Sequence, residues 1–212
     1  MTQPAAVCPN CGARIVFRWS SSVQTVCEYC KSVLVRTDVD LKKIGQVAAL
    51  PPDSSPIQLN TEGVYRNKGF VVIGRILYAY DDGGWNEWHL MMNTGENGWL
   101  SDAQNEYAVS MAAPGRKLPA SSAQVKVGQQ YAWDNRSYVV TSITRAHYKG
   151  VQGELPFQYW NKDEVMFVDL RSENGEFATL DYSDDAPALY LGELVDFSDL
   201  HFKNLRAFEG WS

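Results

Sequence analysis

Four cysteines in two close pairs dominate the start of this sequence. Cys8 and Cys11 form one C-x2-C pair, and Cys27 and Cys30 form the second after a fifteen-residue gap. This spacing is typical of a zinc site, because a tight turn places both sulfurs of a pair on one side. Four thiolates fill every position of a tetrahedral ion, so we expect one structural zinc ion that does not activate water. Iron in the same sulfur cage, or disulfides, are the alternatives.

The segment around the cysteines is too short to be stable without a cross-link. About 40 residues bury too little apolar surface to offset the entropy of the chain, and a bound metal supplies the missing stability. Between the pairs, apolar and basic residues alternate as in a half-buried strand: Ile15, Phe17 and Trp19 with Arg14 and Arg18. We expect residues 1–44 to form a zinc ribbon. The tract GQVAALPPDSSPIQLN, residues 45–60, is rich in proline and serine and predicts a linker.

Composition and charge exclude several classes of protein. The 212 residues are 45% apolar and 21% charged, as expected of a folded domain with a packed core. A net charge of -6 argues against nucleic-acid binding over the whole surface. The chain contains no run of about 18 apolar residues, and its start, MTQPAAVCPNCG, has no basic segment followed by an apolar one. We therefore expect a cytoplasmic protein without a transmembrane segment.

The body of the chain reads as short strands separated by turns. Alternating runs of Tyr, Val, Phe and Trp are punctuated by DDGG, NTGENG, WDNRS and SENGE. The runs at 70–80 and 138–148 can be overlaid, each with an aromatic residue five positions upstream, Tyr65 and Trp133. The prediction is a mainly β, antiparallel domain over 61–205 built from two related halves, 61–113 and 124–205, followed by a tail at 206–212. The halves could form a sandwich or paired small barrels.

Several tracts of this body suggest a family. W-x-E-W, WLS, GELPF, FATLDY and LYLGE follow one another along the chain. In this respect the region from about 57 to 205 closely resembles the bacterial family called domain of unknown function 4178, some members of which carry a ribbon. The resemblance implies a β-rich domain of two related halves without an established catalytic activity. By analogy, it also implies a cytosolic accessory protein beside a membrane-associated, stress-related assembly.

Aromatic residues and a carboxylate concentrate in one stretch of the body. They are Trp85, Glu87, Trp88 and Trp99. Such a cluster can build a groove for a peptide or ligand. Packing of one sheet face is the alternative, in which Glu87 points outward or pairs with Arg75 or Lys68.

Four carboxylates are candidates for chemistry. Glu154 lies in the apolar tract GELPF, a setting that can raise the pKa of a carboxyl group. Together with Glu87, Asp169 and Asp181 it is the basis for an alternative function, a carboxylate-dependent enzyme. Carboxylates beside turns more commonly accept hydrogen bonds from backbone amides. The sequence contains no G-x-S-x-G, phosphate-binding loop or H-E-x-x-H motif, so no catalytic residue is assigned.

These observations leave three hypotheses. The first is a non-catalytic adaptor that binds other proteins through the ribbon and open strand edges. The second is nucleic-acid binding through the ribbon, with Arg14 and Arg18 on phosphates beside Trp19. Its weakness is charge, because four thiolates around a divalent ion reduce the formal +3 of residues 1–44 to about +1. The third is the enzyme, for which the sequence identifies no small-molecule substrate.

Overall fold

The computed structural model describes residues 5–37, 40–47, 54–158 and 164–207. We call residues 5–47 the N-terminal module. Its strands are β1 (Ala5–Val7), β2 (Arg14–Val16), β3 (Gln24–Val26), β4 (Ser32–Arg36) and β5 (Leu41–Gln46). The body contains β6 (Glu62–Tyr65), β7 (Lys68–Tyr80), β8 (Gly83–Met92), β9 (Asn97–Ala103), β10 (Glu106–Ala112), the 3-10 helix η1 (Ser122–Gln124), β11 (Gln130–Trp133), β12 (Arg136–Leu155), β13 (Val165–Arg171), β14 (Glu176–Asp181), β15 (Ala188–Val195) and the 3-10 helix η2 (Phe197–Leu200).

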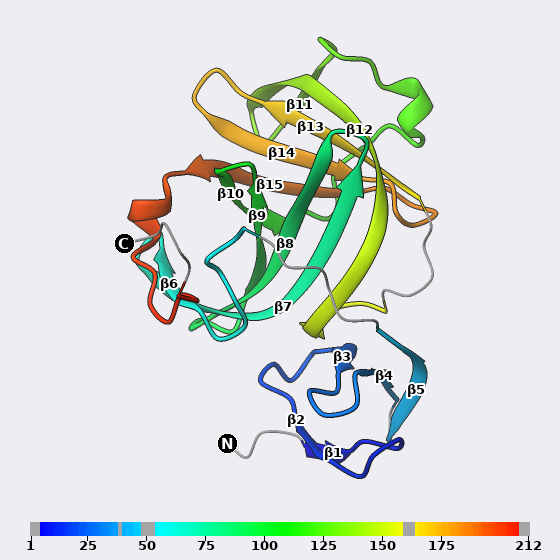
Figure 1. Cartoon of the computed structure of the whole chain (residues 1–212). Helices are drawn as coiled ribbons and strands as arrows, with labels where there is room; N and C mark the ends of the chain where they lie inside the picture. Colours follow the sequence, from blue (N-terminus) through cyan, green and yellow to red (C-terminus); the bar gives the residue numbers. More distant parts are fainter. Residues whose placement is uncertain (1–4, 38–39, 48–53, 159–163, 208–212) are drawn as a thin grey trace.

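Eight strands of the body close into one barrel. The order is β7-β8-β9-β10-β15-β14-β13-β12, and β12 pairs with β7 again (Figure 1). Each of these pairings is antiparallel, so the prediction of a mainly β, antiparallel domain is confirmed. The sequence left a sandwich or paired small barrels open, and the structure has a single barrel to which each half contributes four strands. The reason is that a four-stranded half has two unpaired edges, which joining the halves removes.

The two halves begin with equivalent hairpins. In each, a short strand ends at an aromatic residue, Tyr65 or Trp133, before a two-residue turn leads into a long strand. Both turns have positive φ angles at both residues, 48° and 61° at Arg66 and Asn67, and 52° and 62° at Asp134 and Asn135. This is the turn geometry that matches the natural twist of a hairpin. The overlay found in the sequence therefore corresponds to one hairpin used twice.

The barrel wall is apolar on much of its outer face. Trp88 and Leu90 of the first half are buried under β6 and the segment around η2. Tyr138 and Leu170 of the second half belong to a separate apolar core that includes Val125 and Trp133. Because apolar cores cover the outer face, polar side chains can lie on the inner face of the wall, in the part of the barrel that is distant from the N-terminal module.

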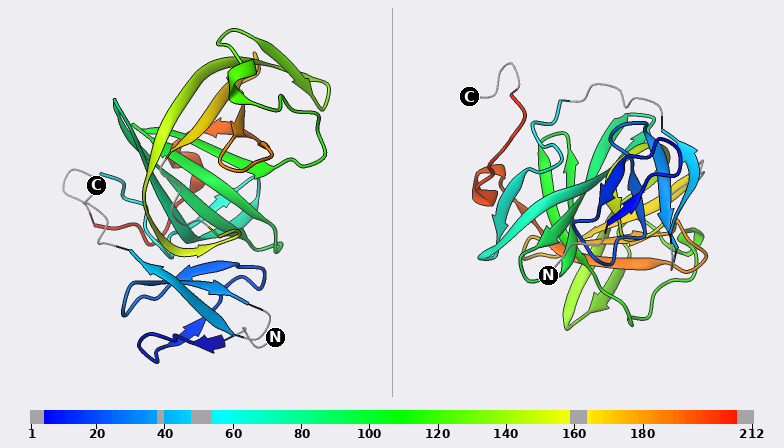
Figure 2. Two further views of the ribbon diagram at one scale, coloured as in Figure 1. Left: turned by 90° about the vertical axis from the view of Figure 1, so that its right-hand side faces the viewer. Right: turned by 90° about the horizontal axis from the view of Figure 1, so that it is seen from below.

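The N-terminal module closes one end of the barrel. Val26 of β3 and Val33 of β4 pack in the same apolar cluster as Val151 and Leu155 of β12. Figure 2 (right), seen from below, shows the module lying across the barrel. β12 makes the connection: it pairs with β13, then with β7, and through Glu154 and Leu155 with β3. The sheet of the module is thus continuous with that of the barrel.

Two glycines make this crossing of strands sterically possible. Gly153 has a φ of +65°, a conformation that favours glycine. A Cβ atom on Gly74 would lie 2.0 Å from the carbonyl oxygen of Glu154. Side chains at these positions would force β7 and β12 apart.

The predicted domain boundaries can be compared with the strands. β5 runs to Gln46, into the segment predicted as a linker. Residues 48–53 of that linker lie outside the described residues. Ile57 is buried in the core of the first half, and the Arg206 amide donates to the Pro56 carbonyl oxygen at 2.8 Å. Residues 208–212 of the predicted tail also lie outside the described residues.

Candidate metal centre and barrel cavity

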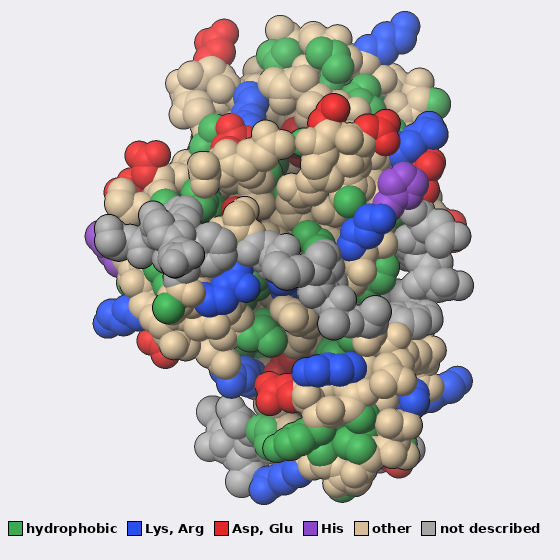
Figure 3. Space-filling view, viewed as in Figure 1, with side chains coloured by type: hydrophobic (Ala, Val, Ile, Leu, Met, Phe, Trp, Pro, Cys, Tyr) green, Lys and Arg blue, Asp and Glu red, His purple; other side chains and the backbone are tan. Residues whose placement is uncertain are grey.

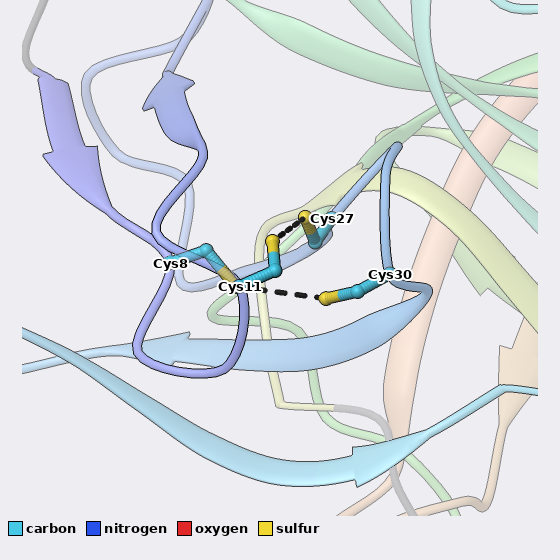
Figure 4. Close-up of side chains that lie close together, drawn as sticks. All are labelled: Cys8, Cys11, Cys27 and Cys30. Atoms are coloured by element: carbon cyan, nitrogen blue, oxygen red, sulfur yellow. Dashed lines mark hydrogen bonds between the residues drawn. The ribbon is translucent and has the colours of Figure 1, made fainter.

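The four cysteine sulfurs converge between two turns of the N-terminal module (Figure 4). Their Sγ atoms all lie within 4.8 Å of one another, with Cys8 to Cys30 and Cys11 to Cys27 each 3.7 Å apart. A tetrahedral ion with metal–sulfur bonds of about 2.3 Å needs sulfurs about 3.8 Å apart. A disulfide needs about 2.05 Å, and all four cysteines are free. The donor set fits a bound metal ion.

Two equivalent turns position these sulfurs. The amide of Gly12 donates to the carbonyl oxygen of Cys8, and the amide of Lys31 donates to that of Cys27, both at 2.9 Å. Gly12 has a φ of +76°, as its place after the second ligand predicts. Lys31 has a φ of +58° at the matching position, which its residue type did not indicate. The module therefore presents two copies of one turn, each of which carries two of the four potential metal ligands.

Local hydrogen bonding favours the metal-binding form of one ligand. The Ser32 hydroxyl lies 3.2 Å from Cys30 Sγ. The hydrogen bond between these two groups is the main reason why the pKa of Cys30 is lowered to about 5, whereas the pKa of Cys11 is raised to about 12. Because the thiolate is the form that binds metal, Cys30 is the ligand that this arrangement favours.

Glu154 joins the module to the barrel. Its carboxylate accepts hydrogen bonds from the amides of Arg18 and Trp19, at 2.8 and 3.2 Å, and from the Ser22 hydroxyl at 2.5 Å. Its side chain is buried, with an exposed fraction of 5%. Its role is thus to bind backbone amides, and those amides belong to a segment more than 130 residues away. Glu154 lies apart from the other three candidate carboxylates.

His89 lies next to the contact between Glu154 and the module, and both of its ring nitrogens have hydrogen-bond partners. Its Nδ1 donates to the Glu154 carbonyl oxygen at 2.8 Å, and the Asn97 amide lies 3.2 Å from Nε2. The Trp19 ring meets the His89 ring edge-on, with centroids 5.4 Å apart. Burial lowers the pKa of His89 to about 4, so the imidazole is neutral.

A cavity inside the barrel brings together the other three carboxylates. A space of about 340 Å³ is lined by Glu87 and Asp169, and an adjoining space of about 40 Å³ by Glu87 and Asp181. Further polar side chains line the two spaces: Ser101, Ser110, Ser142, Thr144, Thr179 and Tyr190. Aromatic side chains line them too: Tyr78, Tyr80, Trp85, Trp99, Phe157, Phe167 and Phe177. The cavity is therefore both acidic and aromatic.

Glu87 faces this cavity, so the expectation that it points outward or pairs with Arg75 or Lys68 is wrong. It accepts hydrogen bonds from Trp85 Nε1 and from the Ser101 hydroxyl, each at 2.9 Å. The Arg75 guanidinium instead lies 4.9 Å from the centre of the Trp88 ring, and Lys68 pairs with Glu96. The sequence correctly separates Trp88 and Leu90 from Glu87 on opposite faces of β8. The error lies in the side: the apolar residues cover the outer face of the barrel wall, so Glu87 points inward.

Burial shapes the acidity of the cavity. It raises the pKa of Glu87 to about 8, and the negative charges of Asp169 and Asp181 add to the effect. Burial likewise raises the pKa of Asp169, whose two oxygens accept hydrogen bonds from Thr179 at 2.8 Å and Ser142 at 3.2 Å. Near neutral pH, Glu87 is therefore largely protonated.

Two of the three tryptophans line the cavity. Trp85 lines the larger space, where its ring lies 5.0 Å from that of Tyr78 and 5.5 Å from that of Phe167. Trp99 lines the smaller space and stacks on Phe157 at 5.8 Å. Trp88 belongs to the apolar core outside the wall. Trp85 and Trp88 lie on opposite faces of β8, because side chains alternate along a strand, so Trp88 cannot line the cavity.

The basic residues of the module are exposed, but most of its aromatic rings are covered. Arg14 and Arg18 are exposed. Trp19 packs on His89, and Phe17 is 2% exposed beneath the Arg36 guanidinium. Stacking of nucleic-acid bases, as the second hypothesis requires, would have to displace these contacts.

The comparisons place the chain in a family. The model of the domain of unknown function family DUF4178 matches residues 58–197, and the chain belongs to this family. That match spans β7 to β15 and thus the whole closed barrel. No curated protein and no solved structure matches the chain. In the described part of the chain, no helix has the length and apolar character needed to cross a membrane.

Proposed function

We propose that this protein is a non-catalytic binding protein, whose barrel holds a small ligand and whose zinc ribbon closes one end of the barrel. The main support is the cavity of about 340 Å³ inside the closed wall. Pockets for small molecules commonly measure about 300 to 1,000 Å³ and combine apolar walls with a few polar groups. The lining of this cavity has that composition.

The proposed metal is one structural zinc ion held by Cys8, Cys11, Cys27 and Cys30. Support comes from the tetrahedral spacing of four thiol ligands, which leaves no position for water or substrate. Elemental analysis of the purified protein is expected to give about one zinc per chain. Iron as the bound metal, or a metal-free protein with an ordered N-terminal module, would contradict this assignment.

A carboxylate-dependent enzyme is less well supported. Glu154 is separate from the cavity, and Glu87 and Asp169 accept hydrogen bonds from hydroxyl groups of the same wall. Catalysis by carboxylates needs an acid and a base arranged about a reacting atom, with their pKa values separated by the environment. Binding requires only the cavity and its charge.

Two neighbouring residues of β12 allow a direct test of ligand binding. Thr144 lines the cavity, whereas Arg145 points outward and pairs with Glu164. Thr144→Phe fills the cavity, and Arg145→Phe adds the same ring outside. In a titration with a fragment library followed by amide NMR, we expect the wild type and Arg145→Phe to bind the same fragments and Thr144→Phe to lose them. Equal binding by both variants would contradict a cavity site.

Protein binding by the ribbon is a second proposal. Three apolar side chains of the module are exposed: Val7 at 58%, Val16 at 42% and Tyr29 at 77%. Figure 3 shows apolar surface on the module at the bottom of the view. We propose that this surface contacts a protein partner in the cytoplasm, in the adaptor role beside a membrane-associated assembly.

The adaptor proposal is tested by comparing two variants. Val7→Asp should abolish capture of a partner from native cells, whereas Val127→Asp, at a residue 63% exposed on the body, should not. A partner that is retained by both variants, or lost by both, would argue against the ribbon surface.

A further inference from the structure

We propose that the ligand of the barrel cavity is an organic cation, bearing an ammonium or guanidinium group, with Asp169 and Asp181 as counter-charges and the ring of Trp85 as part of its contact surface. This inference rests on the proposed function, since it specifies what the cavity binds. Four features of the cavity support it.

The charge of the lining is unbalanced. Among the described residues that line the two spaces, four are acidic, Glu87, Glu106, Asp169 and Asp181, and one, Arg171, is basic. Arg171 pairs with Glu106 at 2.6 Å, while its Nη1 atom is buried without a hydrogen bond to any described residue. Like charges inside a protein repel one another more strongly than in water. A positively charged ligand removes this repulsion, and an anion would increase it.

The acidity of Glu87 reflects the same imbalance. The pKa of its carboxyl group is raised to about 8, mainly by burial and further by Asp169 and Asp181. A cation bound nearby would lower that pKa, because it favours the charged form. Ligand binding and release of a proton from Glu87 are thus expected to be linked.

Aromatic rings supply the apolar part of the surface. Trp85, Tyr78 and Phe167 form one cluster with ring centroids 5.0 to 5.5 Å apart. All three line the cavity. A cation over the face of an aromatic ring is stabilised by a cation–π interaction, which is stronger when the cation and the ring are both shielded from water.

A hydroxyl group of the lining offers an acceptor for a cationic ligand. Ser110 lines the smaller space and is 4% exposed. An ammonium group bound in this space can donate a hydrogen bond to its hydroxyl oxygen.

A metal ion fits the cavity less well than an organic cation. Among the described residues, the four cysteines are the group of three or more potential ligands whose donor atoms lie within 4.8 Å of one another. The cavity carboxylates are therefore too far apart to surround one ion, whose oxygen ligands lie about 2.0 to 2.6 Å from the metal. A molecule with several atoms can reach carboxylates that are separated in this way.

The test uses three probes of similar size and different charge: phenethylammonium, 2-phenylethanol and phenylacetate. Each is titrated into the zinc-bound full chain at pH 7 by calorimetry, and amide NMR locates the site. We expect phenethylammonium to bind about tenfold or more tightly than the alcohol, and phenylacetate to bind most weakly. Tighter or equal binding of the alcohol or phenylacetate in the cavity would overturn the inference but keep the proposed function. If none of the three shifts the resonances of β8, β9, β13 and β14, both are overturned.

Variants separate charge from cavity shape. Asp169→Asn keeps the side-chain volume, and we expect it to weaken phenethylammonium binding on the order of tenfold while 2-phenylethanol binding stays unchanged. Asp181→Asn serves as a second variant with the same expectation. The control is Asp199→Asn, the same substitution at an exposed residue of η2. Equal affinity of phenethylammonium for all three variants and the wild type would overturn the inference.

Discussion

The contact of Glu154 with the N-terminal module allows a quantitative prediction. Its buried carboxylate accepts hydrogen bonds from two backbone amides and one hydroxyl group. Glu154→Gln keeps the shape of the side chain, but its NH2 group cannot accept a hydrogen bond, so at least one donor loses its partner. A hydrogen bond to a charged group contributes about 1.5 to 3 kcal/mol, and an unsatisfied buried donor costs about 1 to 3 kcal/mol. We therefore expect Glu154→Gln to lower the free energy of unfolding by about 2 to 4 kcal/mol.

Denaturant unfolding in the presence of added zinc measures this change. The matched control is Glu173→Gln, at an exposed residue in the turn between β13 and β14, which should change stability by less than about 0.5 kcal/mol. Amide hydrogen exchange adds a local readout, because Arg18 and Trp19 should lose protection in Glu154→Gln while β9 and β10 keep theirs. If Glu154→Gln is no less stable than the control, the carboxylate does not hold the module on the barrel and our reasoning is refuted.

Three further predictions address the metal site, the strand crossing and the cavity. Cys27→Ser should reduce bound zinc from about one per chain to nearly none and broaden the amide resonances of the module; full zinc retention would contradict the four-ligand site. Gly74→Ala should lower the free energy of unfolding by about 3 kcal/mol or more, because its Cβ atom would lie 2.0 Å from the Glu154 carbonyl oxygen. The control is Gly69→Ala, which should be nearly neutral because the atom nearest to its Cβ would be 3.6 Å away. Denaturant unfolding compares the two variants. Because the folded-state pKa of Glu87 is raised to about 8, the folded protein binds an extra proton between about pH 4.5 and 8, so its stability should fall as the pH rises through this range. Glu87→Gln should flatten this decline in unfolding measured at pH 5, 7 and 9, and parallel pH profiles of the two proteins would show that Glu87 does not titrate as described.

Local features of this chain were predictable because their causes are local. The C-x2-C spacing fixes two turns, and glycine after the second ligand supplies the conformation that the first turn needs. Alternating side chains and turn tracts indicate strands and hairpins for the same reason. The resemblance of the runs at 70–80 and 138–148 reflects equivalent long strands of the barrel.

Long-range features were not predictable from residue patterns. Alternation in β8 separates Glu87 from Trp88 but does not say which face is covered, and here β6 and the segment around η2 cover the face of Trp88. The partners of Glu154 lie in the module, far away along the chain. Closure of the barrel between β7 and β12 likewise depends on contacts between the two halves. The gathering of Glu87, Asp169 and Asp181 follows from that closure.

Hydrogen–deuterium exchange of the full protein, with zinc added and then after treatment with a chelator, tests most directly whether the N-terminal module closes the barrel. In the structure, β3 of the module pairs with the end of β12. We therefore expect chelation to increase exchange in β3 and in residues 151–155 together, while β9, β10 and β15 remain protected. Exchange that rises in the module alone, with residues 151–155 unchanged, would contradict this closure.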